Sequence, residues 1–546
     1  MVNWHTFWGL LFVAAVIWSL HTAGLFERDL VNVGGWTLVW RFLLAATRPE
    51  LSFEFLQLTL EATLQTLAYA VCGTFFSVLL GLVGGILSSE VWWSVLVGGF
   101  QSQWLLVRAI LAIPRAIHEL IWGLFFINIF GLDPLVAVLA IAIPFGAITA
   151  KVFSEILDET PRGSLSVLLN SGVPPLNAFA YSLIPQAFPN LLSYTFYRFE
   201  CSIRSAAVLG IIGAGGLGYQ ILLSLQSLRY EQMWTFLIAL MLLSGSTDFW
   251  SATLRRRLGA PSRLNLNTLN FSYQKPLNQS NRLVNLSSFG TIVLLIFSFW
   301  YVKADFTKLW TPQTAQLLAR VIQDSFPPDI SQLSQVLTLS AQTLAMSILA
   351  ITIAGLGGIL LSFSAANNFL LSGGILDTGD NSHRCWLTAG SVFARFLLLF
   401  TRAIPESIWA LIFLFVFFPG ILPGAIALGI HNLGILGRLM AEVIENLDER
   451  TARSIKALGA TGSQVFLYGI LPRTLPRFVA YMLYRWEVCI RATVIVGFVG
   501  AGGLGRLLTE QLSNFDYKGI IATLICFTCL TFVVDLISAT VRRTLR

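Results

Sequence analysis

The amino-acid sequence repeats itself. Residues 115–122 read RAIHELIW and residues 402–409 read RAIPESIW, at a spacing of 287 positions. With the same spacing and no gap, GAGGLG at 213–218 matches GAGGLG at 500–505. Shared hydrophobicity does not produce matches of this kind, so we expect the chain to fold as two copies of one structural unit.

The repeated unit is too apolar to fold in water. The 546 residues are 55% hydrophobic and 12% charged, with a formal net charge of +7 at pH 7. The charged share is about half that of an ordinary soluble protein, so the chain has to bury its apolar surface in a lipid bilayer. Basic residues have a use at the cytoplasmic lipid surface, and the positive charge therefore indicates no nucleic-acid partner.

A polar stretch separates the two copies. Residues 255–286 are rich in Asn and Ser, contain no acidic residue and cannot span a membrane. We therefore expect a first transmembrane domain at 1–258, a cytoplasmic basic linker at 259–283 and a second transmembrane domain at 284–546. Extra residues of the second copy are expected in a loop at 365–390.

Six segments in each copy have the length of a spanning helix, about 20 mostly apolar residues. They lie at 5–24, 57–87, 103–130, 134–157, 177–212 and 232–254, and at 288–303, 333–363, 391–418, 421–446, 464–499 and 519–541. Residues 35–47 are amphipathic and are expected along the membrane interface. The predicted fold class is an all-α polytopic membrane protein of two six-helix repeats, with about 12 transmembrane helices.

An even number of spans brings both copies into the membrane from the same side, as parallel repeats. Arg255, Arg256 and Arg257, the rest of the linker and the basic C-terminal tail then fall on one face. The positive-inside rule assigns that face to the cytoplasm. We expect both termini and the linker to be cytoplasmic.

A loop with its own short helix follows the fourth span of each copy, at 158–179 and 445–466. Each helix is amphipathic and is expected to stop at a glycine, Gly172 or Gly459. The topology places both loops in the cytoplasm. They are either ordinary helical hairpins or docking elements, and their recurrence at the same place in both copies favours docking.

Ionisable residues interrupt the apolar sequence of the fifth span. An ionised side chain near the bilayer centre costs about 3 kcal/mol or more, so such residues pair with each other or line a wet path. Glu200 and Arg204 have the i,i+4 spacing of a helical pair, and so have Arg115 and Glu119 in the third span. These groups form either structural ion pairs or a cationic lining for an anionic solute. The candidate pathway residues are Arg198, Glu200, Arg204, Arg485, Glu487, Arg491, Arg115, Glu119, Arg402 and Glu406.

Glycine-rich blocks are expected to break the fifth span near its end, since irregular backbone in a membrane has to face protein or water. No strand precedes them, so they are not dinucleotide fingerprints. The helix-break glycines are Gly213, Gly215, Gly216, Gly218, Gly500, Gly502, Gly503 and Gly505.

The sequence contains no G-x-x-x-x-G-K-[ST] motif and no catalytic constellation outside the membrane, so we expect a protein that is not an enzyme. Cys526 and Cys529 lie in an apolar run, where small packed thiols are expected instead of a metal site. His118 stands where the second copy has Pro405 and is interpreted as a hydrogen-bonded polar residue, not a ligand. We expect no metal and no cofactor bound by this chain.

Three segments resemble the permease subunit of phosphonate ABC importers: RAIPESIWAL at 402–411, KALGATGSQVFLYGILPRTLP at 456–476 and YRWEVCIRATVIVGFVGAGGLG at 484–505. The part around 453–472 is similar to the EAA loop of binding-protein-dependent permeases, in which a glycine precedes a Leu-Pro or Ile-Pro pair. The resemblance covers 57–254 and 333–541, and it is weaker in the first copy.

The resemblance implies the type I ABC importer fold in a bacterial inner membrane, with both halves of the usual dimer fused so that self-dimerisation is not required. It implies two cytoplasmic ABC ATPase subunits that carry ATP and Mg, and an extracytoplasmic solute-binding protein. Arg453 and Ser166 stand where the family usually has a glutamate, so the two ATPase contacts are expected to be unequal. The coupling residues that the resemblance implies are Ser166, Leu168, Gly172, Arg453, Ala457 and Gly459.

The predicted function is a permease for phosphonate or a related small phosphorus oxyanion, such as phosphite or a phosphate ester. Arginine suits such a solute because its guanidinium presents a fork of donors. Three alternatives stay open: a permease for another small solute such as phosphate or an amino acid, an ion-coupled secondary transporter or channel, and a membrane enzyme.

Overall fold

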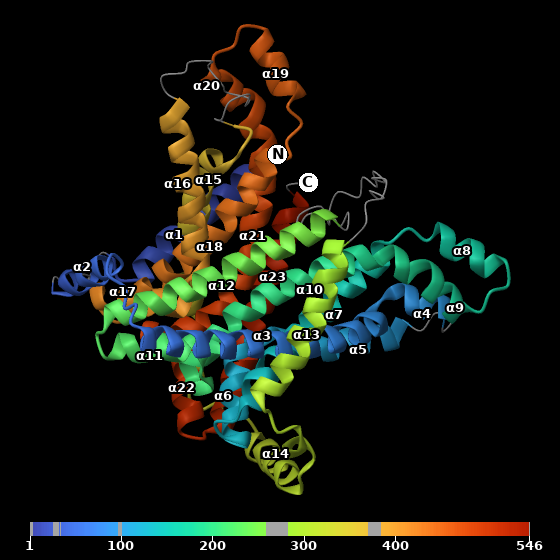
Figure 1. The fold of residues 1–546 in the computed structure, drawn as a ribbon, viewed down its shortest axis with the longest axis vertical. Coiled ribbons are helices and arrows are strands. Elements are labelled where there is room, and N and C mark those ends of the chain that lie inside the picture. Colours follow the sequence, from blue (N-terminus) through green and yellow to red (C-terminus); the bar gives the residue numbers. More distant parts are fainter. Residues whose placement is uncertain are drawn as a thin grey trace. The chain divides into compact units, whose positions relative to one another are not determined.

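The computed structural model describes residues 4–25, 32, 34–96, 101–257, 282–369 and 384–544. All regular elements of these residues are helices. By packing they form two compact units, which we call the first-repeat unit, Ala45–Arg320, and the second-repeat unit, Met1–Leu44 with Val321–Arg546. The predicted all-α fold with two repeats is confirmed, and each unit is described below by itself (Figure 1).

The first-repeat unit is built around a long helix, α3, which packs along α7. Small residues allow the close approach: a Cβ on Gly81 of α3 would lie 2.5 Å from the Thr149 side chain of α7. The elements are α3 Phe53–Ser88, α4 Glu90–Leu96, α5 Gln101–Ala116, α6 Glu119–Phe130, α7 Pro134–Glu159, α8 Gly163–Asn170, α9 Pro175–Ala178, η1 Phe179–Leu183, α10 Ile184–Leu209, η2 Gly210–Ala214, α11 Gly216–Gln226, α12 Tyr230–Arg257, α13 Arg282–Val302 and η4 Phe306–Trp310.

The second-repeat unit has the same plan, with α15 packed along α18. Its elements are α1 Trp4–Thr22, α2 Gly35–Ala45, α15 Leu333–Ala365, α16 Arg384–Ala403, α17 Glu406–Val416, α18 Ile421–Glu445, α19 Arg450–Ala457, α20 Gly462–Gln464, η5 Val465–Ile470, α21 Leu471–Val496, η6 Gly497–Ala501, α22 Gly503–Ser513 and α23 Tyr517–Thr544. Helix α14, Pro312–Ser325, crosses the boundary between the units.

The first helix of each repeat packs with the body of the other repeat. Helix α1 lies against α15 in the second-repeat unit (Figure 1), and α13 lies against α3 in the first-repeat unit. The packing units therefore do not coincide with the transmembrane domains expected at 1–258 and 284–546. Those ranges describe the repeats along the sequence, whereas the units describe which helices bury one another.

The twelve expected spans all correspond to helices of the described residues. Seven are single helices that are long and apolar enough to cross a membrane, four are bent pairs, and α1 is shorter. The third span of each repeat, expected as one helix, is bent by 84° between α5 and α6 and by 95° between α16 and α17. The predicted break at the end of the fifth span is confirmed, with bends of 58° and 68°.

Two expectations fall on parts of the chain outside the described residues. The basic linker expected at 259–283 lies mostly there, and so does most of the loop expected at 365–390.

Candidate functional site

The short helices of the two loops end in the same way. After α8, Gly172 adopts φ +81°, its N–H donates to the Leu169 carbonyl, and the next N–H, of Val173, donates to Leu168. After α19, Gly459 adopts φ +87°, and the N–H groups of Gly459 and the following residue bond carbonyls of the last turn in the same pattern. This is a Schellman motif, which requires a left-handed residue that glycine adopts without strain. The predicted glycine stops are confirmed.

One residue at the same position anchors each loop helix. Leu165 of α8 and Ala452 of α19, which are 287 positions apart, are both buried. Leu165 packs in a cluster with residues of α7, η1 and α10 such as Leu157 and Leu183. Ala452 packs in the corresponding cluster of the other unit. Each loop helix is therefore attached by one face and leaves its other face outward.

The outward faces of the two loop helices differ in chemistry. Helix α8 has the sequence GSLSVLLN and carries no charge, whereas α19, RTARSIKA, carries three basic side chains. Of the candidate coupling residues, one is half-buried, Leu168, and the others are exposed: Ser166, Gly172, Arg453, Ala457 and Gly459. Arg453 is held by Glu449, with an N–O distance of 2.6 Å.

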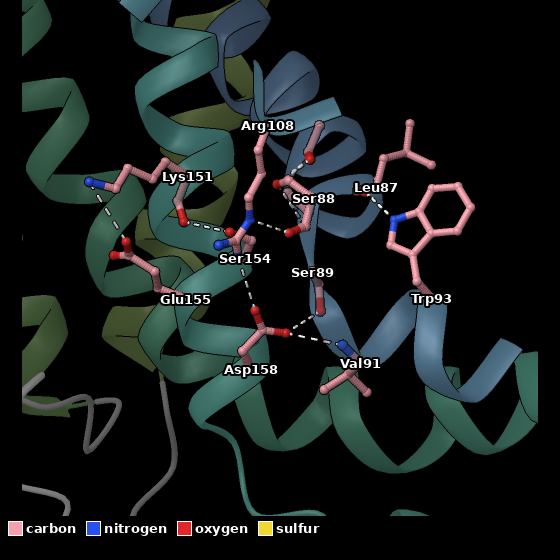
Figure 2. Close-up of polar contacts among 12 residues, drawn as sticks. Leu87, Ser88, Ser89, Val91, Trp93, Arg108, Lys151, Ser154, Glu155 and Asp158 are labelled. Carbon is pink, nitrogen blue, oxygen red and sulfur yellow. Dashed lines mark hydrogen bonds and ion pairs between the residues drawn. The ribbon is translucent and has the colours of Figure 1, made fainter. Parts of the chain in front are cut away.

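An ion pair ties the first loop to the membrane helices (Figure 2). Asp158, in the last turn of α7, accepts from the Ser89 hydroxyl at 2.6 Å and from the Val91 N–H at 3.2 Å. Arg108 of α5 pairs with the same carboxylate at 3.3 Å, and its Nε donates to the Ser88 carbonyl at the end of α3. The pair therefore joins the ends of three helices just before α8 begins.

The second repeat has an equivalent arginine–carboxylate pair at the ends of its helices, and we call both pairs junctions. Arg395 of α16 donates to the Ala365 carbonyl at the end of α15 and pairs with Glu445 at 3.1 Å. Glu445 also accepts from the Asn367 N–H at 3.0 Å. Sequence reasoning missed this junction, although Arg108 and Arg395 match at the repeat spacing of 287 positions.

The glycines of the two GAGGLG blocks allow the backbone to turn and the helices to approach each other closely. Gly213, Gly215 and Gly216 and their second-repeat counterparts have positive φ values, and the chain turns there into α11 or α22. The side chain of Thr66 in α3 accepts from the Leu217 N–H at 2.8 Å. The remaining glycines allow close approach; a Cβ on Gly218 would lie 1.7 Å from a carbonyl oxygen of α10.

Most buried charges of the fifth span have acidic or basic partners on the sixth. Glu200 pairs with Arg255 of α12 at 3.5 Å, and both side chains are buried. Glu487 pairs with Arg542 of α23 at 2.6 Å. The i,i+4 spacing does not predict these partners, which lie on the neighbouring helix. Both glutamates are therefore members of structural ion pairs, which is the first of the two interpretations given for these residues.

Arg204 and Arg491, which lie four residues after these glutamates, also have an acidic residue of the sixth span nearby. Arg491 pairs with Asp535 of α23 at 3.6 Å. In the first repeat, Arg204 bonds the Cys201 sulfur at 3.5 Å and lies within electrostatic range of Asp248, the counterpart of Asp535. Asp248 and Asp535 were not singled out by sequence reasoning.

Arg198 and Arg485, the other two candidate arginines of the fifth span, are held by neutral groups. Arg198 donates to the Tyr194 hydroxyl at 2.7 Å and lies over the Phe145 ring, 4.9 Å from its centre. Arg485 donates to the Asn432 side chain at 2.8 Å. Within the described part of the chain, neither guanidinium has a carboxylate at ion-pair distance. Asn432 occupies the position of Phe145, so the two repeats surround the same arginine differently.

The acidic residues of the third span lie at its bend. Glu119 begins α6 and Glu406 begins α17, directly after the breaks that follow Arg115 and Arg402. An i,i+4 pair needs a continuous helix, so the helical geometry expected for these residues is wrong. His118 caps α6 and accepts from the Leu120 N–H, which agrees with its interpretation as a hydrogen-bonded polar residue. The described residues contain no cluster of three or more His, Cys, Asp or Glu side chains able to hold a metal ion.

Known proteins are similar to this chain over most of its length. Residues 81–260 and 388–546 match the family described as the binding-protein-dependent transport system inner membrane component. The phosphate-import permease protein PhnE of Mycolicibacterium smegmatis is 28% identical over 77% of this chain and 74% of its own length. The phosphite transport system permease protein PtxC of Stutzerimonas stutzeri is 34% identical over 47% of this chain and 86% of its own.

A chain of the MetNI methionine ABC transporter, solved in an inward-facing conformation, aligns with 38% of this chain and 99% of its own, at 22% identity and a TM-score of 0.35. The family match covers both repeats and includes the two loops, the arginine–carboxylate pairs beside them and the glycine blocks described above. The chain therefore belongs to the family of binding-protein-dependent transport system inner membrane components and carries two copies of the family's domain.

Proposed function

We propose that the chain forms the membrane path of an ATP-driven importer for phosphonate or a related small phosphorus oxyanion. The observation that carries the proposal is the duplicated loop helix, built with the same stop, the same buried anchor and the same arginine–carboxylate junction in both repeats. The substrate class rests on the relatives, which are named as phosphate and phosphite permeases.

ATP hydrolysis takes place in this proposal on separate ATPase subunits, and each loop helix docks on one of them. A solute-binding protein delivers the anion from the other side of the membrane. Both termini and both loops lie in the cytoplasm, as the positive-inside rule indicates. Because both family domains are fused, one chain supplies both ATPase contacts.

Arg198 and Arg485 are the proposed anion ligands of the path. The other two candidate arginines of the fifth span, Arg204 and Arg491, each have an acidic residue of the sixth span nearby. Arg198 and Arg485 are held by a hydroxyl, by rings and by an amide, so their charge is not neutralised by a carboxylate among the described residues. A guanidinium in this state can still bind a phosphonate oxygen pair.

Uptake of phosphonate, phosphite and phosphate is the test, measured in cells that lack their own transporters and express this chain with its ATPase and binding protein. We expect Arg485→Gln to lower uptake at least about tenfold, because a lost charged hydrogen bond costs about 1.5–3 kcal/mol. Arg506→Gln is the matched control, since Arg506 is exposed and pairs with Glu510 on the same helix.

Copurification of the ATPase separates transport from assembly. Arg485→Gln and Arg506→Gln should retain the ATPase equally. Normal uptake of all three anions by Arg485→Gln and by Arg198→Gln would refute the assignment of these arginines, and uptake that continues without the ATPase would refute the importer.

A further inference from the structure

Each repeat holds one carboxylate against one imidazole at the bend of its third span, and all four side chains are 13% exposed or less. Glu119 Oε2 lies 3.1 Å from Nε2 of His118. Glu406 Oε2 lies 3.4 Å from Nε2 of His431. Both glutamates occupy the first position of the helix that follows the bend. The two repeats therefore bring the same two chemical groups together at the same place in the fold.

The two imidazoles come from different positions of the repeat. His118 stands at the position of Pro405, and His431, in the middle of α18, stands at the position of Pro144 in α7. A histidine and a proline have thus exchanged places between the copies. The imidazole–carboxylate contact is retained although the residue that supplies the imidazole has changed, so the contact itself is what both repeats have in common.

The hydrogen bonds of the first pair fix its protons. His118 Nδ1 accepts from the Leu120 N–H at 3.2 Å and therefore carries no proton. A neutral imidazole then has its one proton on Nε2, which donates it to Glu119. Ser205 donates its hydroxyl to the other oxygen of Glu119 at 2.6 Å. This pair is a neutral imidazole with an ionised carboxylate and has a net charge of minus one.

The second pair has the opposite arrangement. Nδ1 of His431 lies 2.9 Å from the carbonyl oxygen of Ile404, which can only accept, so Nδ1 carries a proton. Nε2 faces the Glu406 carboxyl, and without a further proton two acceptors would oppose each other in a buried place. Ala492 replaces Ser205 here and offers no hydroxyl. One more proton, on Nε2 or on the carboxyl, makes this pair neutral overall.

We propose that Glu406 and His431 form a proton-binding site that holds one proton more than the pair of Glu119 and His118. The proton joins the start of α17 to the middle of α18, directly after the 95° bend between α16 and α17. Its loss leaves two acceptors, Nε2 of His431 and the Glu406 carboxylate, facing each other at that contact. The second repeat therefore has a bend whose packing depends on a bound proton, and the first repeat has the same bend in a form that does not.

Other charged or titratable groups surround the second pair on α16 and α21. Arg402 lies in the last turn of α16, before the bend. On α21, Cys489 is within electrostatic range of the carboxyl, and Arg485 bonds Asn432, the neighbour of the histidine on α18. A measurement has to report on the pair itself, because a change of pH acts on these groups as well.

Nitrogen-15 NMR of histidine-labelled full-length protein in nanodiscs reads the protons directly and needs no solute. The chain has five histidines, and His118→Gln and His431→Gln assign the two relevant signals. We expect His118 with a proton on Nε2 alone. We expect His431 with protons on both nitrogens, or on Nδ1 alone together with an infrared band of a protonated carboxyl that Glu406→Gln removes.

Glu119→Gln is the matched control and should remove no such band, because Glu119 is ionised. The proposal is overturned if His431 has a bare Nδ1. It is equally overturned if His431 is protonated on Nδ1 alone and Glu406→Gln removes no band. These outcomes leave the proposed importer untouched, since none of them depends on transport.

Anion uptake tests whether transport needs the imidazole–carboxylate contact, and this second experiment rests on the proposed function. His118→Pro should lower uptake, and adding Pro144→His should restore part of it, because the second repeat already has this arrangement. Failure of the double exchange to recover any uptake, with protein that still copurifies its ATPase, would contradict a role for the contact itself.

Discussion

The two repeats keep the contacts that join helices and vary the surfaces around them. Both have an arginine–carboxylate junction beside the loop and a glutamate–arginine pair between the fifth and sixth spans. The loop helices share a buried anchor, yet α8 is uncharged outside and α19 is basic. Arg198 lies over a phenylalanine ring, whereas its counterpart Arg485 bonds an asparagine side chain.

Comparing the two repeats separates residues whose contacts occur in both copies from residues whose surroundings differ between the copies. A contact present in both copies is one that the fold requires, since the two copies have otherwise diverged. A position that differs between the copies is not required by the fold, so it can take on a different role in each repeat. The predictions below test first the shared contacts and then the divergent ones.

The glycine blocks should show the largest effect. In Gly218→Ala the new Cβ would lie 1.7 Å from the Ala207 carbonyl oxygen, and in Gly505→Ala 2.5 Å from that of Val494. Overpacking against backbone cannot relax, so we expect losses above about 4 kcal/mol and little folded protein. Gly163→Ala is the control, because a Cβ there meets nothing within 4 Å. The yield of monodisperse protein measures the effect, and a Gly218→Ala yield equal to the control would contradict the shared role.

The buried ion pairs come next. Arg255→Met leaves Glu200 buried without its guanidinium and should cost about 3–5 kcal/mol, seen as a lower melting temperature in detergent. Arg542→Met should cost less, since the Arg542 side chain is 28% exposed and that of Arg255 is 9% exposed. Adding Glu200→Gln to Arg255→Met should recover part of the loss. Equal costs for both arginines would show that burial does not set the difference.

Thr66 and Thr343 accept hydrogen bonds from the first turns of α11 and α22, and replacing them should cost less stability, by unequal amounts in the two repeats. Thr343→Val removes the acceptor of the Leu504 N–H and should cost about 1–3 kcal/mol. Thr66→Val should cost less, because Gln65 beside it still holds the neighbouring N–H at the start of α11. Serine at either position keeps the hydroxyl and should restore the melting temperature. A larger loss for Thr66→Val than for Thr343→Val would reverse the expected order.

The loop surfaces should show the smallest effect, on docking and not on stability. Charged contacts at a surface contribute about 0.2–1 kcal/mol each and weaken with salt. Combining Arg450→Gln, Arg453→Gln and Lys456→Gln on α19 should therefore reduce the salt dependence of ATPase binding. Val167→Ser on α8 should weaken binding without changing that dependence, because the exposed side chain is apolar. A salt dependence that the α19 variant leaves unchanged would refute the difference between the loops.

The sequence predicts the fold well because the fold rests on local signals that occur twice. Apolar length gives the spans, and glycine at the two loop ends and in the two GAGGLG blocks gives the stops and breaks. The bends of the third span were missed because each bent helix pair has, as a whole, the length and hydropathy of one span. His118 and Pro405, which cap the helices after the bends, do not mark a break by themselves.

The partners of the buried charges could not be predicted from spacing along one helix. They depend on how neighbouring helices are rotated about their axes, and a sequence does not show that rotation. The repeat itself held a usable signal, since Arg255 and Arg542 match at the same spacing as Glu200 and Glu487. The packing of α1 with α15 and of α13 with α3 has no counterpart in the sequence pattern.

Cysteine labelling of the two loops tests the central claim most directly. Val167→Cys and Leu458→Cys place thiols at positions whose side chains are 63% and 88% exposed, the first on α8 and the second directly after α19. A membrane-impermeant maleimide should leave both unlabelled in intact cells and label both in inverted vesicles, with the parent chain as the background. Labelling of the two positions from opposite sides of the membrane, or of both from outside the cell, would contradict a pair of parallel repeats that dock a cytoplasmic ATPase.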